Sequence, residues 1–340
     1  MSTTTAKNGG GLGLTRKDFQ SDQVVRWCPG CGDYAILAQM QKVLPTLEIP
    51  REKFVFISGI GCAARFPYYM DTFGFHTIHG RAPAFATGVK VSNPDLSVWV
   101  ISGDGDALSI SGNHLIHSMR RNVGVKIILF NNRVYGLTKG QYSPTSLLGS
   151  RTKSTPIGSV DYPLHPLTLA LGAECSFVAR TTDRDQKHMA SMFEEMANHE
   201  GTSLLEVLQN CIVFNDGAWH KFTEKGMKEQ NVMYLEDGQP LVYGPEDDRK
   251  GISLEDYKVR VVEADSPDVT VHRVDDEAGG YAHILSRVEL EGGPVPLGVL
   301  RKVERPPFEG LMVDQVAAAQ AKGEGDIDAL LNSGDTWEHH

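Results

Sequence analysis

The sequence lacks long hydrophobic runs. Its apolar segments, such as the one in KIILF (126–130), are far shorter than the roughly 20 residues that a membrane-spanning helix needs, so we expect no membrane association. The first residues are small and polar and carry no hydrophobic run of the secretory type, which predicts a flexible N-terminal tail over residues 1–21 and a cytoplasmic protein.

Basic charge is also in short supply. The chain has 33 lysines and arginines against 43 aspartates and glutamates, a formal net charge of −10. Non-specific binding to nucleic acid needs a basic surface that displaces counterions from phosphates. We therefore expect no nucleic-acid partner. Apolar residues make up 41% of the chain, which is enough for a large globular core.

Cysteine is scarce, and the number is odd. The five cysteines, Cys28, Cys31, Cys62, Cys175 and Cys211, are widely spaced in a long chain, whereas a disulfide framework belongs to small secreted domains. This pattern favours metal or redox chemistry. The segment WCPGCG (27–32) contains a C-x-x-C pair, and Cys175, which has apolar neighbours, is predicted to be a buried structural residue.

Helical and strand patterns alternate from about residue 22 to 215. Short apolar runs predict buried strands over 54–58, 97–102, 125–132 and 203–209. Apolar side chains at helical spacing predict a helix that Asp33 caps and that ends near Pro50, and another that begins at Thr182. Alternation of this kind predicts an α/β fold in which helices flank a parallel sheet. Residues 216–340 are acidic and rich in turns, so we expect a C-terminal extension that contacts a partner.

Two polar motifs follow predicted strands. GDGD (103–106) ends one strand and NNRVYG (131–136) ends the next, and ligands bind at the carboxyl ends of strands in such sheets. The carboxylate of Asp104, the side chain of Asn132 and the carbonyl of Val134 would offer the hard oxygen ligands that suit magnesium on a diphosphate. The dinucleotide motif G-x-G-x-x-G is absent here, and a lone G-x-G is often an ordinary turn.

GDG followed by NN at this distance resembles the thiamine-diphosphate-binding domain of thiamine enzymes. The resemblance implies that Asp104, Asn132 and the Val134 carbonyl are magnesium ligands.

The cysteines allow three readings from the residues alone. W-C-x-x-C is typical of thiol-disulfide exchange, in which a helix N-terminus stabilises a thiolate. Cys62 and Cys211 also follow predicted strands, however, so four sulfurs could converge at one edge of the sheet. Four thiolates suit zinc or an iron-sulfur cluster equally well.

Five motifs occur in one order: WCPGCGDYAIL, GIGC, HGRAPAFATGVK, GDGD and NNRVYGLTKGQ. Together they resemble the β subunit of 2-oxoacid:ferredoxin oxidoreductases, most closely the 2-oxoglutarate type. The resemblance covers residues 22–215 and implies a thiamine-diphosphate and iron-sulfur domain, with one 4Fe-4S cluster on Cys28, Cys31, Cys62 and Cys211. It also implies a set of cofactor-contacting residues: Ile60, Gly61, Cys62, Ala63, His79, Gly103, Asp104, Gly105, Asp106, Asn132, Val134, Gly136 and Leu137.

The resemblance implies an activity and partners. Family members decarboxylate a 2-oxoacid oxidatively, or carboxylate in reverse, with thiamine diphosphate. The acyl group passes to coenzyme A, and electrons pass through the cluster to ferredoxin. The glutamate that contacts the thiamine pyrimidine is expected on an α subunit, in an (αβ)2 assembly.

Two cations point to the substrate. Arg65 lies three residues after Cys62, where the family's substrate-selecting residue lies, and Lys139 is a second candidate. Arginine pairs bidentately with carboxylates, so we expect Arg65 to bind the distal carboxylate of 2-oxoglutarate. The alternatives are a surface arginine or a contact to the α subunit, pyruvate or another 2-oxoacid as substrate, or a non-catalytic electron-carrier module that binds metal through its cysteines.

Overall fold

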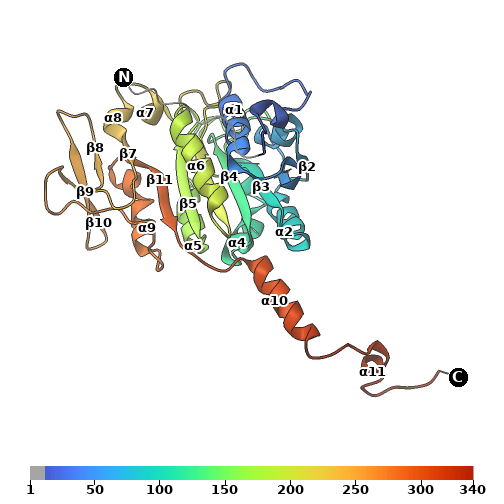
Figure 1. Cartoon of the computed structure of the whole chain (residues 1–340). Helices are drawn as coiled ribbons and strands as arrows, with labels where there is room; N and C mark the ends of the chain where they lie inside the picture. The colour runs from blue at the N-terminus through green and yellow to red at the C-terminus, as the bar shows by residue number, and fades with distance from the viewer. Residues whose placement is uncertain (1–11, 340) are drawn as a thin grey trace.

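An eight-stranded sheet runs through the centre of the computed structural model, which describes residues 12–339 (Figure 1). Its strand order is β2-β1-β3-β4-β6-β5-β11-β7. The bounds are Phe73–His76 (β2), Phe54–Ser58 (β1), Ser97–Gly103 (β3), Val125–Asn131 (β4), Ser203–Leu208 (β6), Phe177–Thr182 (β5), Val295–Lys302 (β11) and Val232–Tyr234 (β7).

The sheet is parallel except at one pair. The strands from β2 to β5 all pair in parallel, and so do β11 and β7, whereas β11 runs antiparallel to β5. The predicted α/β fold with a mostly parallel sheet is therefore confirmed. The antiparallel strand comes from the C-terminal part of the chain, in which the sequence pattern predicted no strand.

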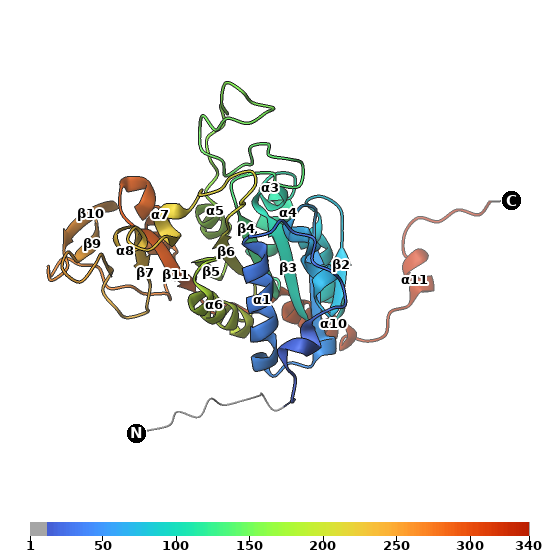
Figure 2. The same cartoon turned by 90° about the horizontal axis from the view of Figure 1, so that it is seen from above.

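Helices cover both faces of the sheet, as the view from above shows for α1 (Asp33–Val43) and α6 (Gln186–Asn198) on one side and α5 (Pro166–Gly172) on the other (Figure 2). Successive strand residues point to opposite faces, so Phe54 and Phe56 join a core under α1 and α6. Val55 and Ile57 join a second core on the other face. That face is covered by α2 (Ala82–Ser92), α4 (Gly112–Arg120), α5 and α9 (Gly280–Leu285).

Two helix starts differ from the predictions. Thr182 ends β5, and α6 begins at Gln186 because the Asp185 side chain accepts a hydrogen bond from the His188 amide. Asp33 does not cap α1; the N-cap is Gly32, and the Asp33 side chain is buried. The short 3-10 helices are η1 (Arg16–Phe19), η2 (Leu44–Leu47), η3 (Arg51–Lys53), η4 (Ala63–Tyr69) and η5 (Val288–Glu291).

The part of the chain after residue 215 completes the central sheet through β7 and β11. It also forms a three-stranded antiparallel sheet of β8 (Val242–Tyr243), β9 (Lys250–Glu255) and β10 (Lys258–Glu263), with the short helices α7 (His220–Thr223) and α8 (Lys228–Asn231). The boundary placed near residue 215 stays a prediction. Of the flexible tail predicted for residues 1–21, residues 1–11 lie outside the described residues, whereas Arg16–Phe19 forms η1 and Phe19 is buried in the core. Among residues 12–339 no helix is long and apolar enough to cross a membrane.

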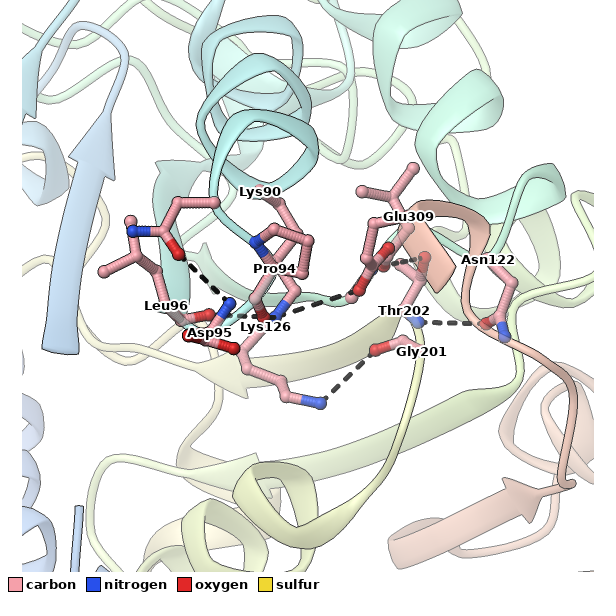
Figure 3. Close-up of polar contacts among 12 residues, drawn as sticks. Lys90, Pro94, Asp95, Leu96, Asn122, Lys126, Gly201, Thr202 and Glu309 are labelled. Atoms are coloured by element: carbon pink, nitrogen blue, oxygen red, sulfur yellow. Dashed lines mark hydrogen bonds and ion pairs between the residues drawn. The ribbon is translucent and has the colours of Figure 1, made fainter. Parts of the chain in front are cut away.

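A C-terminal arm of α10 (Phe308–Gln320) and α11 (Ile327–Leu331) extends away from the body of the molecule (Figure 1). Its base is fixed by Glu309, whose carboxylate accepts a hydrogen bond from the Gly124 amide at 3.0 Å and lies 3.8 Å from Lys90 Nζ. Figure 3 shows this polar cluster, in which Asn122 also accepts a hydrogen bond from the Thr202 amide. The arm is therefore anchored at its first turn.

Candidate functional site

The four strands that carry the sequence motifs are consecutive neighbours, β1-β3-β4-β6, in the sheet. Because these strands are parallel, the motifs that follow them meet at one sheet edge. A pocket of about 220 Å³ opens there. All of the residues predicted to contact the cofactor line it: Ile60, Gly61, Cys62, Ala63, His79, Gly103, Asp104, Gly105, Asp106, Asn132, Val134, Gly136 and Leu137. Their contact with a cofactor stays a prediction.

Asp106 holds the first wall of this pocket together. Its Oδ1 accepts hydrogen bonds from the amides of Ile60 (3.2 Å) and Gly80 (2.8 Å), and its Oδ2 accepts one from the Ser102 hydroxyl (2.6 Å). His79 Nδ1 lies 2.7 Å from Asp106 Oδ1. Asp106 thus joins the loops after β1, β2 and β3, and the His79 ring lies beside its carboxylate at the pocket.

Asp104 lies at the bottom of the pocket and is almost completely buried. Its Oδ2 accepts hydrogen bonds from the hydroxyls of Ser143 and Thr145, the latter at 2.6 Å. Burial raises the pKa of the Asp104 carboxyl, and the two hydroxyl donors oppose that rise. A cation in the pocket would favour the carboxylate further.

The loop after β4 packs directly onto the GDG turn. Tyr135 donates a hydrogen bond to the Gly105 carbonyl at 2.9 Å, and a Cβ on Gly105 would lie 2.2 Å from the Tyr135 ring. Only glycine fits there. The Asn132 side chain donates to Gln209 Oε1 (2.9 Å) and accepts from the Val134 amide (3.2 Å). These contacts fix the loop that carries the predicted magnesium ligands.

The four cysteines other than Cys175 line a second pocket, of about 210 Å³, beside the first. Trp27 donates a hydrogen bond to the Cys62 carbonyl at 2.7 Å, which ties the C-x-x-C segment to the GIGC loop. A Cβ on Gly136 would lie 3.6 Å from the sulfurs of both Cys62 and Cys211. Cys175 is fully buried elsewhere in the core, as the sequence predicted.

Burial sets the protonation of these thiols. It raises the pKa of Cys62 to about 12 and also raises the pKa of Cys31 and Cys211, since a thiolate loses hydration in the pocket. Within residues 12–339, no three His, Cys, Asp or Glu side chains converge on the position of a single metal ion. The four thiols line the second pocket.

The two predicted substrate cations lie at the edge of these pockets. Arg65 lines the cysteine pocket and a further cavity beside it, together with Arg26. No carboxylate in the described residues lies within salt-bridge distance of Arg65 or Lys139. Lys139 is exposed and adopts a positive φ of 75°. Both cations are therefore free to meet an anion.

Several site residues were missed by the sequence reasoning. Asp33 lines both pockets, and burial together with repulsion by Asp183 raises its pKa to about 7. Gln209 donates a hydrogen bond to the Cys31 sulfur at 3.4 Å. Ser143 and Thr145 reach Asp104 from a loop. Their chemistry gives no local signal because only tertiary packing brings them to the site.

Comparison with known proteins bears on this geometry. Residues 59–207 match the family model described as the thiamine pyrophosphate enzyme C-terminal TPP binding domain. The chain is 50% identical to the 2-oxoglutarate oxidoreductase subunit KorB of Mycobacterium tuberculosis, an alignment that covers 94% of this chain and 87% of that protein. The chain belongs to the 2-oxoacid:ferredoxin oxidoreductase β subunits. This family consists of enzyme subunits, which argues against the non-catalytic electron-carrier alternative.

Other relatives agree with the family assignment. The chain is 40% identical to the 2-oxoacid:ferredoxin oxidoreductase 1 subunit beta of Aeropyrum pernix, over 71% of this chain and 74% of that one. The solved 2-oxoglutarate:ferredoxin oxidoreductase of Magnetococcus marinus, with 2-oxoglutarate, coenzyme A and succinyl-CoA bound, is similar in structure. Its TM-score is 0.76 at 31% identity, and the match covers 98% of this chain and 100% of that one.

Proposed function

We propose that this β subunit, with an α subunit, forms a 2-oxoglutarate:ferredoxin oxidoreductase. The complex would convert a 2-oxoacid and coenzyme A to an acyl-CoA and carbon dioxide, or run the reverse carboxylation, and exchange electrons with ferredoxin. The observation that carries the proposal is the shared wall of the two pockets: Asp33, Cys62, Asn132, Gly136 and Leu137 line both. A cofactor in one pocket would therefore lie directly against a redox group in the other.

The first pocket fits Mg²⁺ and a diphosphate. Asp104 offers a carboxylate, and Asn132 and the Val134 carbonyl offer neutral oxygens, which is a hard donor set suited to Mg²⁺. His79 is positioned beside Asp106 at the pocket wall, where it can donate to the diphosphate. Thiamine diphosphate, when bound, supplies the electron sink for decarboxylation of the 2-oxoacid.

The second pocket fits a 4Fe-4S cluster on Cys28, Cys31, Cys62 and Cys211. The raised thiol pKa values mean that ligation would have to displace protons, so cluster binding is expected to weaken at low pH. Cys28 is exposed, so the pocket reaches the surface where ferredoxin would accept an electron. We place the complex in the cytoplasm as an (αβ)2 assembly, in which the α subunit supplies the glutamate for the pyrimidine.

Composition of the purified complex tests the proposal as a whole. The β and α subunits are co-expressed, purified without oxygen and analysed for iron, sulfide, zinc and released thiamine diphosphate. We expect a brown protein with iron and sulfide in equal amounts, bound thiamine diphosphate, and coenzyme A-dependent reduction of ferredoxin by 2-oxoglutarate. Cys211→Ser should lose the iron, whereas Cys175→Ser should keep it. A colourless zinc protein without thiamine diphosphate would contradict the proposal.

Arg65 tests the substrate assignment. Loss of a charge-assisted hydrogen bond costs about 1.5–3 kcal/mol, so Arg65→Ala should lower kcat/KM for 2-oxoglutarate relative to pyruvate roughly 10- to 150-fold. Arg26→Ala is the matched control, because Arg26 lines the same two cavities as Arg65. An unchanged substrate ratio in Arg65→Ala would contradict the role of this residue, and an equal change in both variants would point to a general charge effect.

A further inference from the structure

A short loop that the sequence motifs do not include contacts Asp104, one of the residues that line the first pocket. Residues 143–146 contain three hydroxyl side chains, Ser143, Thr145 and Ser146, and each is almost completely buried, with an exposed fraction of 2–4%. Burial of a hydroxyl is costly unless it makes a hydrogen bond, so three in one loop call for partners. All three have them.

The three hydroxyls divide into two kinds. Ser143 and Thr145 both donate to one oxygen of Asp104, Oδ2, and the single Thr145 hydroxyl proton is shared with Asn131 Oδ1, which lies 3.0 Å away. Ser146 instead donates to the Arg133 carbonyl at 2.7 Å and accepts from the Ser143 amide at 2.8 Å. Ser146 thus holds the loop against the NNRVYG segment, and the other two hydroxyls act on the carboxylate.

This arrangement leaves the two carboxylate oxygens of Asp104 inequivalent. Oδ2 takes both hydroxyl donors, while Oδ1 accepts no side-chain hydrogen bond from any residue between 12 and 339. Hydroxyl donors to one oxygen fix the rotation of the carboxylate about its Cβ–Cγ bond.

We propose that Ser143 and Thr145 are positioning residues that hold Asp104 Oδ2 so that Oδ1 faces the divalent cation of the bound diphosphate. The inference rests on the proposed function, since it concerns the same pocket. It adds a metal-orienting role for a loop outside the GDG and NN motifs. Groups that orient a metal ligand typically contribute 10- to 100-fold to metal affinity.

The test measures cation binding rather than turnover. The α–β complex is stripped of metal and thiamine diphosphate, and Mn²⁺ is titrated by electron paramagnetic resonance in the presence of saturating thiamine diphosphate. Thr145→Val keeps the shape and removes the hydroxyl, Thr145→Ser restores the hydroxyl, and Ser143→Ala removes the second donor. Ser159→Ala is the matched control, because it removes an equally buried hydroxyl that donates to the Leu147 carbonyl and has no contact with Asp104.

We expect Thr145→Val to raise the Kd for Mn²⁺ about 10- to 100-fold, with a smaller rise in Ser143→Ala, while Thr145→Ser stays within about threefold of the unmodified complex. Thermal unfolding checks that each variant is folded. Equal Mn²⁺ affinity in Thr145→Val, Ser143→Ala and Ser159→Ala would overturn the positioning role alone. Absence of Mn²⁺-dependent thiamine diphosphate binding in the unmodified complex would overturn both the positioning role and the proposed function.

Discussion

Gly105→Ala should damage the cofactor pocket through one collision. The added Cβ would lie 2.2, 2.6 and 2.8 Å from three carbons of the Tyr135 ring, whereas carbon atoms pack at about 3.5–4.0 Å. The ring would therefore have to move by more than about 1 Å. That movement would break the 2.9 Å hydrogen bond from Tyr135 to the Gly105 carbonyl.

The expected cost follows from these two effects. Overpacking costs about 1–3 kcal/mol, and the lost hydrogen bond adds about 1 kcal/mol, so the sum is about 2–4 kcal/mol. Tyr135 lines the pocket, so part of this cost should appear as weaker cofactor binding and part as lower stability. If all of it appeared in binding, the affinity for thiamine diphosphate would fall roughly 30- to 1000-fold.

A double-mutant cycle with Tyr135→Ala isolates the collision. Thiamine diphosphate binding to the α–β complex is followed by quenching of tryptophan fluorescence at saturating Mg²⁺, and thermal unfolding is measured alongside. Because the ring is absent in Tyr135→Ala, adding Gly105→Ala to that variant should cost little. Strictly additive losses in the double variant, or wild-type binding and stability in Gly105→Ala, would refute the packing argument.

Two further predictions concern stability. Burial lowers the pKa of the His199 ring to about 3 in the folded protein, so the ring stays neutral there. In the unfolded chain the ring binds a proton below about pH 6.5. The free energy of unfolding therefore decreases as the pH falls below that value. Between pH 7.5 and 5 the free energy of unfolding, measured with urea, should fall by about 2 kcal/mol because of His199, and the His199→Gln variant should not show this decrease. Parallel pH profiles of stability for the unmodified protein and the variant would contradict the prediction. Glu309→Ala leaves the buried Gly124 amide without its acceptor and should cost about 1–3 kcal/mol, with faster proteolysis of α10. Substitution of the exposed Asp314 on the same helix should leave the cleavage rate unchanged, and equal rates in the two variants would show that Glu309 does not anchor the arm.

Local pattern was enough to predict much of the fold. The runs at 54–58, 97–102 and 125–132 became β1, β3 and β4 with ends correct to within one residue, because buried strands need continuous apolar sequence. The run at 73–76 was missed, since β2 is an exposed edge strand without that signal. The antiparallel β11 was missed because its place depends on β5, which is distant in the sequence.

By itself, the sequence determined which residues we propose to carry the chemistry: the glycines and aspartates after β3, the asparagine loop after β4, and four spaced cysteines. Residue type and short-range spacing encode these features directly. Only the tertiary structure decided that β1, β3, β4 and β6 are neighbours, so that their loops meet in two pockets with a common wall. It also decided that Ser143 and Thr145 reach Asp104 and that Asp33 is buried between the pockets, because strand order and burial arise from long-range packing, which no local pattern contains.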